Sequence, residues 1–141
     1  MIQTQSVTVY GDPRGKGRPR FSYGTGHAYT DAATADYERR VEKAWVSENN
    51  FTFGKYPTEV IIKAFFSVPS SLSKKKKAQL YGMPCLKKPD VDNIAKIVLD
   101  ALNGVAYQDD AQIEKLRVEK MYVSSETESP RVEIAITAVT D

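Results

Sequence analysis

The sequence predicts a single small α+β domain with about four strands, mostly antiparallel or mixed in direction, and about three helices. Three observations support this prediction. The 141 residues fit one domain comfortably and two poorly, so residues 1–141 are taken as one unit. Apolar segments typical of strands alternate with segments that have helical spacing. The composition, with 41% apolar and 27% charged residues, is that of an ordinary soluble globular chain.

The first half of the chain predicts strand, loop, helix and strand in that order. Residues 4–10 are rich in β-branched side chains and predict a strand. Residues 14–26 are rich in glycine, which predicts a loop with a short hairpin through Phe21, Tyr23 and Tyr29. Thr30 or Asp31 then caps a helix to about Ser47, and residues 58–68 predict a buried strand. The expected core face of that helix carries Tyr37, Val41, Ala44 and Trp45.

The second half predicts two helices and two strands. Ser73 caps a short helix that Gly82 ends. The best-defined helix opens at Pro89 and Asp90 and runs to about Asn103, with Gly104 just beyond it. Residues 112–123 and 130–139 predict a closing pair of antiparallel strands. The expected core face of the longer helix carries Val91, Ile94, Val98, Ala101 and Leu102.

Composition and charge exclude several classes of protein. The single Cys85 excludes an intrachain disulfide framework and any zinc site built from cysteines, and the single His27 excludes motifs with two imidazoles. No apolar run reaches the roughly 20 residues of a membrane span, so we expect a soluble cytoplasmic protein. The net charge of +2 conceals a block at residues 55–88 with eight basic and one acidic side chain. Such a block favours a polyanionic partner.

Carboxylates gather around the best-defined helix. At 100° per residue, Lys96 lies about 40° and Asp100 about 80° from Asp92, which makes one polar ridge opposite the apolar face. Asp90 opens the helix, and Asp109 and Asp110 follow it. Such oxygen ligands suit Mg²⁺. Each Asp also has a structural interpretation, as a helix cap, a dipole partner, an ion-pair partner of Lys96 or a turn residue.

Two basic segments and one further lysine are candidate DNA contacts. In the first segment, an early loop, basic residues alternate with Gly and Pro. The second segment is a run of four lysines at the start of the short helix. Lysines there oppose the helix dipole, although they could also form a solvated face. Phosphate contacts supply affinity without sequence information, so we expect recognition of DNA shape. The candidates are Arg14, Lys16, Arg18, Arg20, Lys74, Lys75, Lys76, Lys77 and Lys88.

The acidic motif resembles the signature of the RusA family of Holliday junction resolvases. The resemblance lies in the run from Lys88 to Lys96, in the run from Leu99 to Gly104, and in Asp109-Asp110-Ala111-Gln112-Ile113. The loop at 16–20 also resembles phage and prophage members. The resemblance implies a small homodimeric, Mg²⁺-dependent endonuclease that cuts four-way junctions symmetrically. It assigns the essential carboxylates to Asp90, Asp92 and Asp110 and the important lysine to Lys96, and it matches Tyr107, Asp100 and Asp109 to family positions.

We therefore expect a structure-selective endodeoxyribonuclease of DNA recombination and repair, encoded by a bacterium or a phage. Mg²⁺, or Mn²⁺, is the expected metal, held by Asp90, Asp92 and Asp110, with no small-molecule cofactor. Lys96 would act on charge at the scissile phosphate. Because a four-way junction has twofold symmetry, a homodimer is the expected assembly.

Three alternatives remain open from the sequence. A non-catalytic protein that binds branched DNA would need the basic block without the three carboxylates. A nuclease for other branched or flapped DNA would need the same residues. A small metal-dependent hydrolase of nucleotides would need a closed pocket and no extended basic surface.

Overall fold

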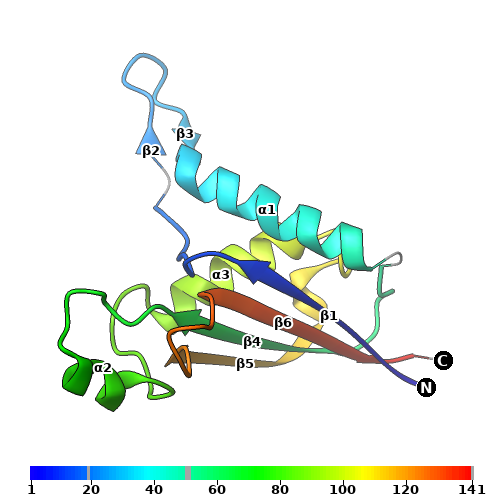
Figure 1. Ribbon diagram of the computed structural model, residues 1–141. Coiled ribbons are helices and arrows are strands. Elements are labelled where there is room, and N and C mark those ends of the chain that lie inside the picture. Colours follow the sequence, from blue (N-terminus) through cyan, green and yellow to red (C-terminus); the bar gives the residue numbers. More distant parts are fainter. Residues whose placement is uncertain (19, 50–51, 141) are drawn as a thin grey trace.

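The protein is built on a mixed four-stranded sheet (Figure 1). The structure, a computed structural model, describes residues 1–18, 20–49 and 52–140. The sheet order is β1-β6-β4-β5, formed by β1 (Ile2–Tyr10), β6 (Arg131–Val139), β4 (Thr58–Phe66) and β5 (Ile113–Tyr122). β6 is antiparallel to both neighbours, whereas β4 and β5 are parallel. The predicted α+β class is confirmed.

The helices α1 (Ala32–Glu48) and α3 (Val91–Leu102) pack on one face of the sheet, and the short α2 (Lys74–Leu80) lies apart at one end (Figure 1). A short hairpin precedes α1 and consists of β2 (Arg20–Phe21) and β3 (Ala28–Tyr29). A 3-10 turn, η1 (Asp110–Gln112), precedes β5. The predicted caps are confirmed: Asp31 accepts from the Thr34 N–H at 2.9 Å, and Ser73 accepts from the Lys76 N–H at 3.3 Å. No helix within the described ranges is long and apolar enough to cross a membrane.

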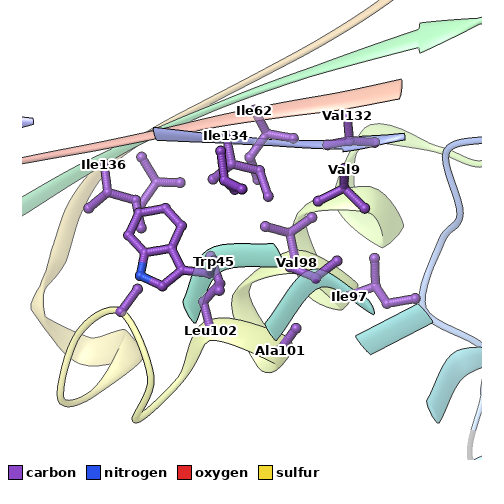
Figure 2. Packing of buried hydrophobic residues seen from close by; sticks show 14 of the residues in the cluster. Val9, Trp45, Ile62, Ile97, Val98, Ala101, Leu102, Val132, Ile134 and Ile136 are labelled. Atoms are coloured by element: carbon purple, nitrogen blue, oxygen red, sulfur yellow. The ribbon is translucent and has the colours of Figure 1, made fainter. Parts of the chain in front are cut away.

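The hydrophobic core lies between the sheet and the two long helices (Figure 2). Every second residue of β6 is buried, as expected for a central strand with one face covered. Trp45 of α1 and Leu102 of α3 meet the sheet residues Ile134 and Ile136 in this layer. Tyr37, Val41 and Trp45 are buried as predicted, while Ala44 is partly exposed and packs on the edge of the core.

The predicted antiparallel pair of closing strands is wrong. β5 and β6 are not neighbours, because β6 inserts between β1 and β4 and leaves β5 on the outer side of β4. The long chain between β4 and β5 contains α2 and α3, which is the crossover that a parallel pair requires. β5 is therefore an edge strand, and the residues along its first half are mostly exposed.

The prediction that Val91 lies in the core is also wrong. Val91 is 47% exposed because it is the first residue of α3 and precedes the part of the helix that the sheet and α1 cover. Ala95 and Ile97, which lie outside the predicted set, are buried instead. The buried face of α3 is thus wider than the apolar stripe because the helix packs against both the sheet and α1.

Candidate active site

Asp90 and Asp92 lie at the start of α3 with carboxylates that do not cap it. Asp90 occupies the N-cap position, but its side chain makes no capping hydrogen bond. It forms an ion pair with Lys88, whose Nζ lies 2.8 Å from Oδ1. The hydrogen bond from Lys88 lowers the pKa of Asp90. Asp92 is exposed in the first turn. Both carboxylates are therefore accessible to a ligand.

The acidic pair after α3 divides into one structural and one unsatisfied carboxylate. Asp109 caps η1: its Oδ1 accepts from the Ala111 N–H at 3.0 Å, and its own N–H donates to Gln112 Oε1 at 3.1 Å. Asp110 Oδ1 is buried and has no hydrogen-bond partner among the residues that the structure describes. A buried anionic oxygen without a donor is costly, and a cation would satisfy it.

Tyr107 accounts for the unsatisfied state of Asp110. Its buried hydroxyl donates to the Leu99 carbonyl at 2.8 Å. A phenol has only one proton, and this geometry directs it to Leu99, so Asp110 Oδ1 receives no hydrogen bond from it. Burial, and then the charge and contact of Asp110, raise the pKa of Tyr107 far above its ordinary value. The hydroxyl therefore stays protonated. Its hydrogen bond to Leu99 holds the segment that contains Tyr107 and Asp110 against α3.

An ion-pair network joins α3 to α1 and to the loop before the hairpin. Lys96 Nζ lies 3.1 Å from both carboxylate oxygens of Asp100. Lys16 Nζ lies 3.1 Å from Asp100 Oδ2 and 2.9 Å from Glu38 Oε2. The sequence predicts Lys96 between Asp92 and Asp100, and the ion pair that the structure describes for Lys96 is with Asp100 alone. Burial raises the pKa of Asp100, but the hydrogen bonds from Lys16 and Lys96 together bring it below its usual value.

The loop at residues 14–18, which we call the anchored loop, contacts the start of α3. The Lys16 N–H donates to the Asn93 carbonyl at 2.9 Å, and the Lys16 side chain, a predicted DNA contact, is only 21% exposed within the network. A Cβ on Gly15 would lie 2.7 Å from Pro89 Cβ, and a Cβ on Gly17 would lie 2.2 Å from Asp31 Oδ2. Only glycine permits this close approach. The loop is thus held beside Asp90 and Asp92.

The other predicted DNA contacts are accessible. Lys74, Lys75 and Lys76 are exposed on α2, and Lys77 is partly exposed. α2 lies at the same end of the sheet as the start of α3 (Figure 1). The Lys88 side chain is 84% exposed. Arg14 and Arg18 are exposed in the anchored loop, whereas the side chain of Arg20 lies outside the described part of the structure.

The predicted metal ligands come from two places along α3. Asp90 and Asp92 lie at its start, while Asp110 lies beside the Tyr107 hydroxyl that contacts Leu99. Leu99 is about two turns, or roughly 10 Å, beyond Asp92 along the helix axis. Within the described ranges, no group of three or more His, Cys, Asp or Glu side chains is placed to hold one metal ion. Lys96 lies on the helix between the two places.

Comparison with known proteins decides the family. The family model described as Endodeoxyribonuclease RusA matches residues 10–137. The chain belongs to the RusA endodeoxyribonuclease family. It is also 38% identical over 138 residues to the uncharacterized protein YqaN of Bacillus subtilis (strain 168), a match that covers 94% of each chain. The resemblance inferred from the acidic motif is confirmed, and the fold described above is that of a RusA-family nuclease domain.

Sequence reasoning missed Glu38, a member of the ion-pair network in the candidate site. Glu38 lies on α1, far from the signature, and reaches the signature only through Lys16 and Asp100. A signal was present, because Glu38 falls about 20° from Trp45 on a helical wheel and so borders the buried face of α1. A carboxylate at the edge of an apolar face predicts a cationic partner from another element.

Proposed function

We propose that this protein is a Mg²⁺-dependent homodimeric endonuclease that resolves four-way DNA junctions by paired cuts in recombination and repair. The observation that carries the proposal is Asp110 Oδ1, a buried carboxylate oxygen with no partner among the described residues. The RusA-family match supports nuclease chemistry for the chain as a whole. The relative from Bacillus subtilis supports a bacterial or phage origin, and the proposed place of action is the cytoplasm of such a cell.

The residues fit a hard divalent cation. Asp90, Asp92 and Asp110 offer only carboxylate oxygens, the ligands that Mg²⁺ and Mn²⁺ prefer. The structure places them in two groups along α3, and we propose that they close on one ion when it binds. When bound, such an ion polarises the scissile phosphate and makes water acidic enough to attack it. Without cations these carboxylates repel the DNA backbone, so we expect Mg²⁺ to strengthen DNA binding, which the basic segments retain in weaker form in EDTA.

The chain's own cations bind and orient the phosphate. Lys96 is held against Asp100 with 63% of its side chain exposed, so its ammonium is positioned yet accessible. It lies between the two groups of carboxylates, where it can stabilise charge that develops on the phosphate. Lys74–Lys77 and Lys88 bind backbone phosphates on the same end of the molecule without reading sequence.

A cleavage assay with one substitution tests the proposal. The chain is incubated with a synthetic four-way junction in Mg²⁺ or in EDTA, and products are resolved on a denaturing gel. Asp92→Asn keeps the side-chain volume but removes the charge, so cleavage should fall by several orders of magnitude while junction binding persists or tightens. Asp36→Asn, an exposed carboxylate on α1 outside the site, is the matched control and should cut like the parent.

Each contrary outcome removes a different part of the proposal. Cleavage by Asp92→Asn at near the parental rate would remove Asp92 from the site. Cleavage of flapped DNA but not of the junction would change the substrate. Binding by the parent without cleavage in any metal would leave a non-catalytic DNA-binding protein. Sedimentation of the parent as a monomer, free and on the junction, would refute the homodimer.

A further inference from the structure

The hairpin between the anchored loop and α1 carries three exposed aromatic side chains. Phe21 is 69% exposed, Tyr29 is 52% exposed, and Tyr23 at the tip is fully exposed. Figure 1 shows the hairpin projecting beyond the end of α1, away from the sheet. We call residues 21–29 the aromatic hairpin. Its aromatic rings contribute nothing to the core.

The aromatic hairpin has a defined backbone despite its size. The Ser22 N–H donates to the His27 carbonyl at 3.0 Å, and the Gly26 N–H donates to the Ser22 carbonyl at 2.9 Å. Gly26 has φ +69°, a conformation that favours glycine. An isolated two-stranded hairpin is marginally stable in water and normally gains stability by packing its side chains. Here the large side chains are left open, which indicates that a partner covers them.

The charge around the aromatic hairpin identifies the chemistry of that partner. Residues 13–30 contain four basic side chains and no acidic one. Lys16 is committed to Glu38 and Asp100, but Arg14 and Arg18 are exposed, and neither has an ion pair among the described residues. Exposed aromatic rings beside a cationic segment are the arrangement that binds unpaired nucleic-acid bases, with stacking on the rings and phosphates on the cations.

The hairpin's position links it to the candidate active site. The loop at its base contacts the start of α3 through the hydrogen bond from the Lys16 N–H to the Asn93 carbonyl and through the close approach of Gly15 to Pro89. Asp90 and Asp92 lie in this same segment. When DNA is bound at these carboxylates, the nucleotides next to the bound phosphate therefore lie within reach of the aromatic hairpin, which is held in place by the anchored loop.

We propose that the aromatic hairpin stacks on unpaired or unstacked bases at a DNA branch point and so makes binding selective for branched over linear DNA. Tyr23 supplies the main stacking surface. This inference rests on the proposed function, because it names how the nuclease selects its substrate. Base stacking is interrupted at a branch point, so bases are accessible there and not in a continuous duplex.

Binding in EDTA tests the proposal without cleavage. Fluorescence anisotropy compares the full chain and its variants on a four-way junction, a single strand and a blunt duplex. Tyr23→Leu should weaken binding to the junction and the single strand about 10-fold, and should change binding to the duplex less than about twofold. The dependence on salt should stay as in the parent, because the variant keeps every cation that binds a phosphate. Tyr23→Phe, which keeps the ring, should restore binding.

Tyr10→Leu is the matched control, since Tyr10 is 64% exposed at the end of β1 and lies outside the hairpin. A 2-aminopurine beside the branch point should change fluorescence with the parent and not with Tyr23→Leu. Equal affinities of Tyr23→Leu and Tyr10→Leu for the junction would overturn the proposal. So would a parent that binds all three DNAs equally or binds none, or a loss of dimer on Tyr23→Leu, which would make the hairpin a protein contact.

The same experiment separates this proposal from the proposed function. A parent that cuts the junction while Tyr23→Leu binds it normally would leave the nuclease intact and refute the hairpin's role. A parent that selects branched DNA through Tyr23 but cuts nothing in Mg²⁺ would support the hairpin's role and refute the nuclease.

Discussion

Replacing Asp110 by Asn should make the metal-free protein more stable while it abolishes cleavage. In the absence of a cation, Asp110 Oδ1 is buried without a donor, and the Tyr107 proton is already donated to Leu99. An Asn amide at position 110 removes the charge and can donate to the free lone pair of the Tyr107 oxygen. A buried unsatisfied polar group costs about 1–3 kcal/mol. For a chain of this size the relief corresponds to a rise in Tm of about 2–10 °C.

Thermal unfolding in EDTA and in Mg²⁺ measures both effects. In EDTA the Tm of Asp110→Asn should exceed that of the parent. Adding Mg²⁺ should raise the parental Tm with concentration and leave the variant nearly unchanged, because only a native state that binds the ion is stabilised by it. Asp109→Asn is the control, since Asn caps a helix about as well as Asp and both responses should stay parental. A lower Tm for Asp110→Asn in EDTA, or equal responses to Mg²⁺, would refute the argument.

Three further predictions concern the charged groups around α3. Lys96→Met should lower the single-turnover cleavage rate about 10²–10³-fold with junction affinity nearly unchanged, and a rate within about threefold of the parent would make Lys96 a scaffold residue. Replacing Lys74–Lys77 by Gln should flatten the slope of log affinity against log salt by up to about 0.9 for each phosphate that the variant no longer binds, and an unchanged slope would assign phosphate binding to the loop at 14–18 instead. The pKa of Asp100 is lowered on folding, so the parent should be more stable than Asp100→Asn above the unfolded pKa of about 3.9 and should lose that advantage as pH falls through the lower folded value. Urea unfolding at pH 7 and near pH 2 measures this, and an equal difference at both pH values would exclude the charge of Asp100 as its source.

The local elements could be predicted from the sequence because their signals are local. The caps Asp31 and Ser73 and the ends of α3 follow from side chains within one turn of each helix. Strand pairing could not be predicted in the same way. β5 and β6 have similar apolar patterns, and nothing in either pattern indicates that β6 pairs with β1 rather than with β5. Pairing depends on contacts between residues far apart in the chain, which periodicity does not contain.

In the candidate site, too, the local features could be predicted from the sequence and the long-range contacts could not. Asp90, Asp92 and Lys96 lie within two turns of one helix, so their common ridge follows from helical geometry. That Lys96 pairs with Asp100 and not with Asp92 does not follow from helical geometry, because Asp100 also binds Lys16 from a distant loop. The distinction between Asp109 and Asp110 depends on contacts that the sequence does not contain, since one side chain caps η1 and the other lies beside Tyr107.

The position of β6 has a consequence for how the chain acquires its structure during synthesis. Among the described strands β6 leaves the ribosome last, and within their sheet it alone pairs with both β1 and β4. Until residues 131–139 emerge, β1 has no strand to pair with, and the apolar faces of α1 and α3 lack the middle of the sheet beneath them. Assembly therefore waits for contacts between the two ends of the chain, and contacts of such long sequence separation form slowly. A chain released before Arg131 would lack the central strand of the sheet and leave the apolar residues that pack against it uncovered.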